Sequence, residues 1–255
     1  MTPRNVVNPA RLAISWLTVA PVRGPAQVDR AVAGRAITLA PLVGLLLGGG
    51  VAGALWVFEW TGLTSALAGL LAVGLLALCT RGMHLDGLAD TADGLGSYGP
   101  PERARQIMKS GSAGPFGVAA LIFAIGIQAF AFAALVDERR WGAIVLAVAL
   151  GRVAVVIACR RGVPAAPESG FGTLVAGTQP VASVIFWSAL ALGCSVFVLP
   201  GNFWLGPVVV IATLAGSVLI TRHCVRRFGG MSGDILGATV EITTSLAALG
   251  FSTTF

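Results

Sequence analysis

Long apolar runs recur through the whole sequence, and they constrain the fold more than any other feature. Only 11% of the 255 residues are charged and the mean hydropathy is +0.86, whereas a soluble domain carries about 25% charged residues. A run of about 20 apolar residues is long enough to cross a bilayer as a helix, and a helix satisfies its own backbone polar groups in lipid. The sequence therefore predicts an all-α, polytopic integral membrane helical bundle.

About seven membrane segments are expected, and no polar linker separates them, so residues 1–255 are interpreted as one membrane-embedded domain. Asn8 followed by Pro9 predicts a helix start near the N-terminus, and we expect this first helix to lie along the membrane interface. The predicted spans are Ala36–Phe58, Leu63–Cys79, Phe116–Val136, Trp141–Cys159, Val181–Leu199, Phe203–Ile220 and Ile235–Phe251.

The positions of the basic residues predict the orientation. Fourteen of the 17 lysines and arginines fall in residues 1–35, 80–115, 160–180 and 221–234, and only Arg139 and Arg140 fall in the segments of the opposite side. Because cytoplasmic segments are enriched in basic residues, these four segments are expected on the cytoplasmic side.

Three acids dominate the segment 80–96, which reads TRGMHLDGLADTADGLG. Asp86, Asp90 and Asp93 are spaced by four and three residues, so a helix would carry all three on one face. Like charges at this spacing repel, but a divalent cation takes carboxylate oxygens as ligands. The simpler alternative is a solvated acidic helix end. Since the chain has only 11 acids and three of them fall here, the pattern favours a metal site.

A fourth acid, Asp234, follows a glycine-rich turn before the last predicted span. The turn and Gly233 could offer backbone N–H groups to a phosphate; alternatively, Ser232 or Asp234 caps the helix. The orientation places Asp234 on the same side as the three other acids. We therefore expect the start of the last span to pack beside the acidic helix, with Asp234 within about 12 Å of it, since shared metal ligands lie close together.

Two ionisable residues lie within predicted spans, Arg152 and Glu241. An unpaired charge there costs roughly 2.5–3.5 kcal/mol, so each should have a partner: the other residue, a metal or a substrate phosphate. His84 and Lys109 are further candidates for substrate binding, with an ordinary interfacial histidine and a topology signal as the respective alternatives.

The run His84–Gly94, HLDGLADTADG, resembles the signature of the cobalamin synthase family, the adenosylcobinamide-GDP ribazoletransferases. The similarity covers nearly the whole chain. It continues at Pro41, Ile107–Lys109, Gly114, Phe116–Gly117, Arg152, Glu168, Gly170, Gly172, Gly229–Gly230, Gly233–Ala238 and Glu241.

The resemblance implies a single membrane-embedded catalytic domain that is Mg²⁺-dependent. It would join α-ribazole, or α-ribazole 5′-phosphate, to adenosylcobinamide-GDP and release GMP. Carried over by position, the metal ligands are Asp86, Asp90, Asp93 and Asp234. The catalytic acids are Asp86, Asp93 and Asp234, with both Asp93 and Asp234 open as the general base. The substrate-binding residues are His84, Lys109, Arg152, Gly233 and Glu241.

The same resemblance implies a multi-pass protein of the bacterial inner membrane whose active site faces the cytoplasm. The lipid bilayer and the two substrates are the expected partners, and no nucleic acid is expected. A homo-oligomer is left open. The chain departs from the family pattern at Ser110–Ser112, where the family usually has Asp-Ser-Arg, and at Thr244, where it usually has an acid, so neither position carries a predicted role.

Two other classes remain as alternatives. A CDP-alcohol phosphatidyltransferase has the pattern D-x2-D-G-x2-A-R followed by a second acidic pair; Asp90–Gly94 fits the opening, but the Ala-Arg and the second pair are absent. A cation-coupled transporter would place acids near the membrane midplane in two repeated halves. Here most of the acids lie at one edge, and the sequence has no evident internal repeat.

Overall fold

The structure is a computed structural model that describes residues 8–25, 27–167 and 169–253. Glu168, part of the family pattern, lies outside these residues, as does Arg4 of the positive segments. The described residues form twelve helices and no strand. The helices are α1 (Pro9–Leu17), α2 (Arg30–Thr38), α3 (Ala40–Glu59), α4 (Ser65–Cys79), α5 (Met83–Gly96), α6 (Pro101–Met108), α7 (Pro115–Asp137), α8 (Trp141–Ala158), α9 (Gly170–Val175), α10 (Val181–Ser195), α11 (Leu205–Phe228) and α12 (Gly233–Ser252).

Five of these helices are long and apolar enough to cross a membrane: α3, α7, α8, α11 and α12. The bent pair α4–α5 raises the number to six if it counts as one span, and α10 is apolar but has only 15 residues. The all-helical, multi-pass prediction is thus confirmed. The predicted count of seven spans is not confirmed by the described residues.

The first predicted span begins later than the sequence suggested, because a break at Leu39 separates α2 from α3. Pro41 lacks a backbone N–H and cannot donate to the carbonyl four residues earlier, so continuing α2 through this point would lose a helical bond. Asp29 caps the start of α2 by accepting a hydrogen bond from the Val32 amide at 2.7 Å. Residues 36–38 therefore belong to a separate short helix.

A sharper break separates α4 from α5, whose axes differ by 94°. Arg81 and Gly82 both have left-handed backbone conformations, with φ of 57° and 67°, and the Gly82 amide donates to the Ala77 carbonyl at 2.7 Å. This is the hydrogen bonding of a helix C-terminus. The apolar run therefore ends before the acids begin, and α5 takes a new direction.

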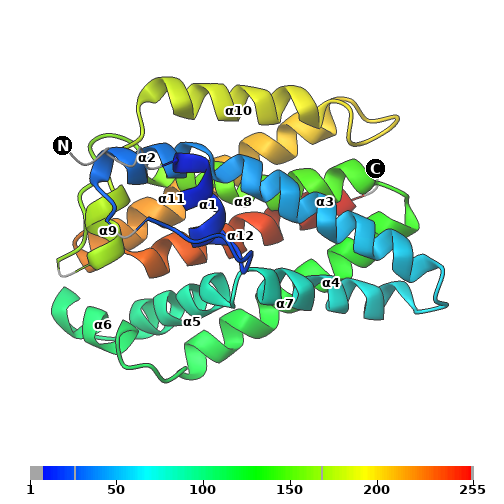
Figure 1. Ribbon diagram of the computed structural model, residues 1–255. Helices are drawn as coiled ribbons and strands as arrows, with labels where there is room; N and C mark the ends of the chain where they lie inside the picture. The colour runs from blue at the N-terminus through cyan, green and yellow to red at the C-terminus, as the bar shows by residue number, and fades with distance from the viewer. Residues whose placement is uncertain (1–7, 26, 168, 254–255) are drawn as a thin grey trace.

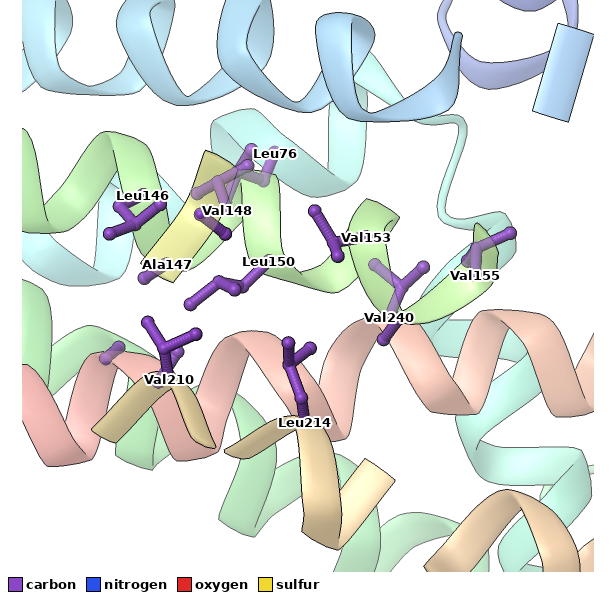
Figure 2. Packing of buried hydrophobic residues seen from close by; sticks show 14 of the residues in the cluster. Leu76, Leu146, Ala147, Val148, Leu150, Val153, Val155, Val210, Leu214 and Val240 are labelled. Atoms are coloured by element: carbon purple, nitrogen blue, oxygen red, sulfur yellow. The ribbon is translucent and has the colours of Figure 1, made fainter. Parts of the chain in front are cut away.

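The core of the bundle is α8, in which 15 of the 18 residues are buried. Figure 2 shows Val148 and Leu150 of this helix among side chains from its neighbours, including Val210 of α11 and Val240 of α12. In contrast, large apolar side chains of α3, α7 and α11 such as Leu46, Phe123 and Leu219 are exposed, as expected where helices face lipid.

Figure 1 shows the segments rich in arginine gathered at one end of the bundle. The N-terminal helices, α6, α9 and the start of α12 lie at this end, whereas the α3–α4, α7–α8 and α10–α11 connections lie at the other end. The candidate site residues belong mostly to the first end.

Candidate functional site

The site is organised by a close crossing of α5 and α12. A Cβ atom at Gly87 would lie 2.7 Å from the backbone oxygen of Asp234, and one at Gly237 would lie 3.2 Å from the backbone of His84. Both distances are shorter than normal contacts between carbon and its neighbours, so the two backbones approach closely only because these positions are glycine. The expected packing of the last span against the acidic helix is confirmed.

Asp86 and Asp234 face a common space from the two sides of this crossing, because both line the same cavity. Asp90 lies one turn further along α5, outside the five long spans. Burial, followed by the neighbouring charges of Asp86, Asp234 and Asp93, raises the pKa of Asp90 to about 6. The four acids therefore form one electrostatic cluster in which like charges repel.

Asp93 differs from the other acids in its contacts. Its side chain is only 8% exposed, and its two oxygens accept hydrogen bonds from the amides of Gly114 and Gly117, at 2.7 and 2.9 Å. These amides belong to the first turn of α7, where backbone donors have no partner within the helix. Asp93 therefore acts as a long-range cap that fixes α7 against α5.

One cavity, the α8 cavity, lies between α2, α5, α8 and α12 and has a volume of about 370 Å³. Its polar wall contains His84, Asp86, Arg152, Gly233 and Asp234. The apolar side chains Trp16, Leu17, Ile37, Val155, Phe171, Leu236 and Val240 line the rest of it. Five residues that were predicted to bind substrate or metal, four from α5 and α12 and Arg152 from α8, thus line a single cavity.

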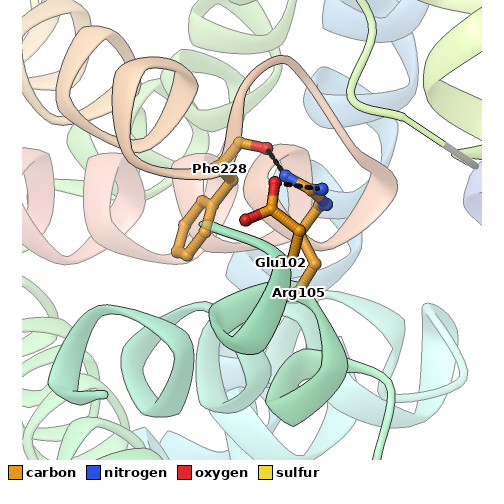
Figure 3. Close-up of polar contacts among 3 residues, drawn as sticks. All are labelled: Glu102, Arg105 and Phe228. Atoms are coloured by element: carbon orange, nitrogen blue, oxygen red, sulfur yellow. Dashed lines mark hydrogen bonds and ion pairs between the residues drawn. The ribbon is translucent and has the colours of Figure 1, made fainter. Parts of the chain in front are cut away.

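A second cavity, the α6 cavity, has a volume of about 240 Å³ and is lined by Arg105, Lys109, Ser169, Ser232 and Asp234 among others. Arg105 donates to the Phe228 carbonyl at 3.0 Å and pairs with Glu102 at 3.2 Å, as Figure 3 shows. The hydrogen bond to Phe228 holds α6 against the end of α11, whereas the pair with Glu102 lies within α6.

The two cavities share a wall made of Phe171, Gly233 and Asp234. Ser232 caps α12 by accepting a hydrogen bond from the Ile235 amide at 3.3 Å, so the capping alternative for this turn is correct. The turn itself is fixed to residues 164–166, because the Met231 amide donates to the Pro164 carbonyl at 2.8 Å and the Ala166 amide donates to the Met231 carbonyl at 2.9 Å. Asp234 is thus held on a rigid turn between two cavities.

A fully formed metal cage is not found: among residues 8–25, 27–167 and 169–253, no three His, Cys, Asp or Glu side chains are placed to enclose a metal ion. The donor set nevertheless fits Mg²⁺, which is commonly held by one or two carboxylates together with substrate phosphates and water. Asp86 and Asp234, which line one cavity, and Asp90 beside them supply hard oxygen donors of this kind. The metal site therefore remains a prediction.

Glu241 has a partner that the sequence analysis did not identify. Gln128 of α7 donates to the Glu241 carboxylate at 2.8 Å and to the Ser245 hydroxyl at 3.1 Å. Gln128 is the one polar residue in the predicted third span. Its position there was the signal in the sequence that it could be a partner for a buried charge. Glu241 lines neither cavity, so its predicted contact with substrate has no support from this geometry.

Comparison with known proteins agrees with the resemblance. Residues 9–252 match the family described as cobalamin-5-phosphate synthase. Among curated relatives, an adenosylcobinamide-GDP ribazoletransferase of Nocardioides sp. is 40% identical over 95% of this chain and 97% of its own length. Proteins of the same name from Corynebacterium efficiens and Bradyrhizobium diazoefficiens are 36% and 39% identical, covering 93% and 98% of this chain and 88% and 96% of their own lengths.

No solved structure matches this one. The family match nevertheless extends from α1 to the end of α12, and it includes all the residues that line the α8 cavity. This chain therefore belongs to the cobalamin-5-phosphate synthase family of membrane transferases.

Proposed function

We propose that the chain transfers the adenosylcobinamide phosphate moiety of adenosylcobinamide-GDP to α-ribazole or α-ribazole 5′-phosphate and releases GMP. The observation that carries this proposal is the position of Asp234, which lies on the wall shared by two cavities. A reaction between two substrates needs both of them to reach one reacting centre. The name of the curated relatives, adenosylcobinamide-GDP ribazoletransferase, supports this choice of substrates.

In this reaction a ribose hydroxyl oxygen forms a bond to the phosphorus that carries adenosylcobinamide. The bond between that phosphorus and the bridging oxygen breaks, and GMP leaves with the electron pair. The hydroxyl proton goes to a carboxylate. Asp234 fits this role better than Asp93, because it lines both cavities whereas both oxygens of Asp93 accept backbone hydrogen bonds of α7. Asp86 faces the same space from α5.

Mg²⁺ would be held by Asp86, Asp90 and Asp234, with Asp93 adjacent, and when bound it supplies positive charge that neutralises the diphosphate and the leaving GMP. Lys109 and Arg105 line the α6 cavity and make it suited to anionic groups of the donor. His84, Arg152 and Gly233 line the α8 cavity, which suits the acceptor.

The test is a reconstitution of the purified protein in detergent or liposomes with Mg²⁺. GMP should appear from adenosylcobinamide-GDP only when α-ribazole or its 5′-phosphate is present, EDTA should stop the reaction, and added Mg²⁺ should restore it. Supplying CDP-diacylglycerol with common alcohols should give no CMP. Release of CMP without GMP would favour a phosphatidyltransferase instead, and a solute flux without either nucleotide would favour a transporter.

The cytoplasmic orientation of the site in the bacterial inner membrane is part of the same proposal. Tyr98 lies between α5 and α6, Glu138 lies between α7 and α8, and both are exposed. Figure 1 shows these two connections at opposite ends of the bundle. Tyr98→Cys should react with a membrane-impermeant maleimide only after the cells are opened, and Glu138→Cys should react in intact spheroplasts. The reverse pattern would contradict this orientation.

A further inference from the structure

Arg152 is a buried charged side chain whose polar contacts include no carboxylate among the described residues. It is 3% exposed and lies on the central helix α8, six residues before its end. One guanidinium nitrogen donates to the Val148 carbonyl of the same helix at 3.2 Å. A second lies 3.4 Å from Nδ1 of His84, and the Nε atom has no hydrogen-bond partner.

No described carboxylate forms an ion pair with Arg152, since the ion pair between Arg105 and Glu102 is the one found in the described residues. Glu241 acts on Arg152 only at longer range, and its carboxylate is engaged by Gln128. The contact with Nδ1 of His84 supplies no negative charge. A buried cation with no carboxylate in contact carries a desolvation cost that is only partly compensated.

The Arg152 side chain lies between α3 and the α8 cavity. At Gly44 of α3, a Cβ atom would lie 3.2 Å from Cδ of Arg152, so α3 covers the stem on one side. Arg152 also lines the α8 cavity, together with His84. Its side chain therefore lies beside the space that a molecule in that cavity would occupy.

The other residues that line the α8 cavity indicate the chemical class of a molecule that would fit it. Trp16 and Phe171 line the cavity and pack edge to face, with ring centroids 5.0 Å apart, and aromatic walls of this kind suit a flat apolar ring. Asp86 and Asp234 line it as well. A volume of about 370 Å³ is at the lower end of the range for small-molecule sites, enough for one nucleotide but too small for a corrinoid joined to GDP.

We propose that the α8 cavity binds the nucleotide acceptor and that Arg152, with His84, recognises its 5′-phosphate, so that this residue determines the preference for α-ribazole 5′-phosphate over α-ribazole. The inference rests on the proposed function and adds to it the substrate class of one cavity and a specificity-determining residue. The heterocycle lies toward Trp16 and Phe171, and the ribose lies toward Asp86 and Asp234.

The experiment compares KM for the two acceptors, with adenosylcobinamide-GDP as donor and GMP release as the signal. In Arg152→Gln, KM for α-ribazole 5′-phosphate should rise about 10- to 100-fold, the size expected for loss of a charged hydrogen-bond donor. KM for α-ribazole should change less than about 3-fold. Arg152→Lys, which keeps the charge but loses the planar fork, should lie between these values.

Arg140→Gln is the matched control. Arg140 directly precedes the same helix, lines neither of the two cavities and donates to the Phe251 carbonyl at 3.0 Å, so the wild-type ratio of the two KM values should be kept. An equal change for both acceptors in Arg152→Gln, or no change for either, would overturn the inference.

Ligand-induced thermal stabilisation of the wild-type protein gives a second readout that needs neither turnover nor a folded variant. The 5′-phosphate of α-ribazole should raise the melting temperature more than α-ribazole at equal concentration, and inorganic phosphate should reduce the difference. Equal shifts would contradict phosphate recognition. If both acceptors bind with unequal shifts but no GMP forms, the proposed reaction fails while recognition of the 5′-phosphate stands.

Discussion

Two helix crossings in this bundle are built in the same way but differ in what surrounds them. In the α3–α8 crossing, a Cβ atom at Gly48 would lie 2.8 Å from the Val145 carbonyl oxygen, and in the α5–α12 crossing one at Gly87 would lie 2.7 Å from the Asp234 carbonyl oxygen. The first crossing is surrounded by apolar side chains such as Val148. The second has Asp86 and Asp234 beside it and a cavity against it.

The comparison shows that close glycine packing by itself marks helix association rather than a site, as is usual in membranes. The site arises where such a crossing coincides with acids that repel one another and with a buried cation without a carboxylate partner. Four sets of substitutions test this difference, beginning with the largest expected effect.

The first change removes the acid at the centre of the α5–α12 crossing. Asp234→Asn should reduce GMP release at least about 100-fold, since it removes a charged group at the reacting centre, while the protein remains folded and inserted. The matched variant at the other crossing is Val148→Ala, which should leave kcat within about 3-fold. Full activity of Asp234→Asn would remove this residue from the catalytic machinery.

The second change inserts one methyl group at each crossing. Gly87→Ala and Gly48→Ala should each destabilise the protein by about 1–3 kcal/mol, because the new Cβ meets backbone atoms that cannot easily move. Only Gly87→Ala should also reduce kcat of the folded fraction, since it displaces Asp234 relative to Asp86. Thermal unfolding in detergent and kinetics on monodisperse protein measure the two effects separately. Equal losses of kcat would mean that the crossings are mechanically coupled.

The third change distinguishes acids on the same helix. Asp93→Asn should lower stability by about 0.5–2 kcal/mol, as for loss of a helix cap, because Asn offers one oxygen where the carboxylate offers two to Gly114 and Gly117. Asp90→Asn should reduce activity. It should not lower stability, because it relieves repulsion within the cluster. The melting temperatures of the two purified variants check this. A lower melting temperature in Asp90→Asn than in Asp93→Asn would contradict the assignment.

The smallest effect is expected at the edge of the site. Glu102 is exposed and pairs with Arg105, and such surface pairs contribute little. A hydrogen bond from the backbone, followed by that from Arg105, lowers the pKa of Glu102, so the residue is charged at neutral pH. Glu102→Gln should leave both the melting temperature and GMP release unchanged within error. A clear loss of activity would assign the α6 helix a larger role than the α6 cavity alone implies.

Much of this arrangement could be predicted from residue spacing. The apolar runs predicted the helices, the spacing of Asp86, Asp90 and Asp93 placed them on one helix, and the distribution of arginines brought Asp234 to the same side. These features depend on local periodicity and on the membrane as a reference plane, both of which can be read from a linear sequence.

The features that were missed depend on contacts between distant segments. The partner of Glu241 is Gln128, 113 residues away, and Asp93 caps a helix that begins 22 residues later. The α4–α5 bend requires a left-handed conformation at Arg81, a residue type that gives no sign of it. Several polar residues compete for such roles, and only the packing of the helices selects among them.

The position of α12 in the chain has a consequence for biosynthesis. Residues 97–232 separate α5 from α12, and at about 5–20 residues per second a ribosome needs roughly 7–27 s to make them. During this interval the nascent protein contains the acids of α5 but not yet α12, the helix that packs against them. Any binding of nucleotide or metal by the finished site must therefore follow insertion of α12, and a ribosome that stalls before residue 233 leaves a membrane fragment that lacks Asp234.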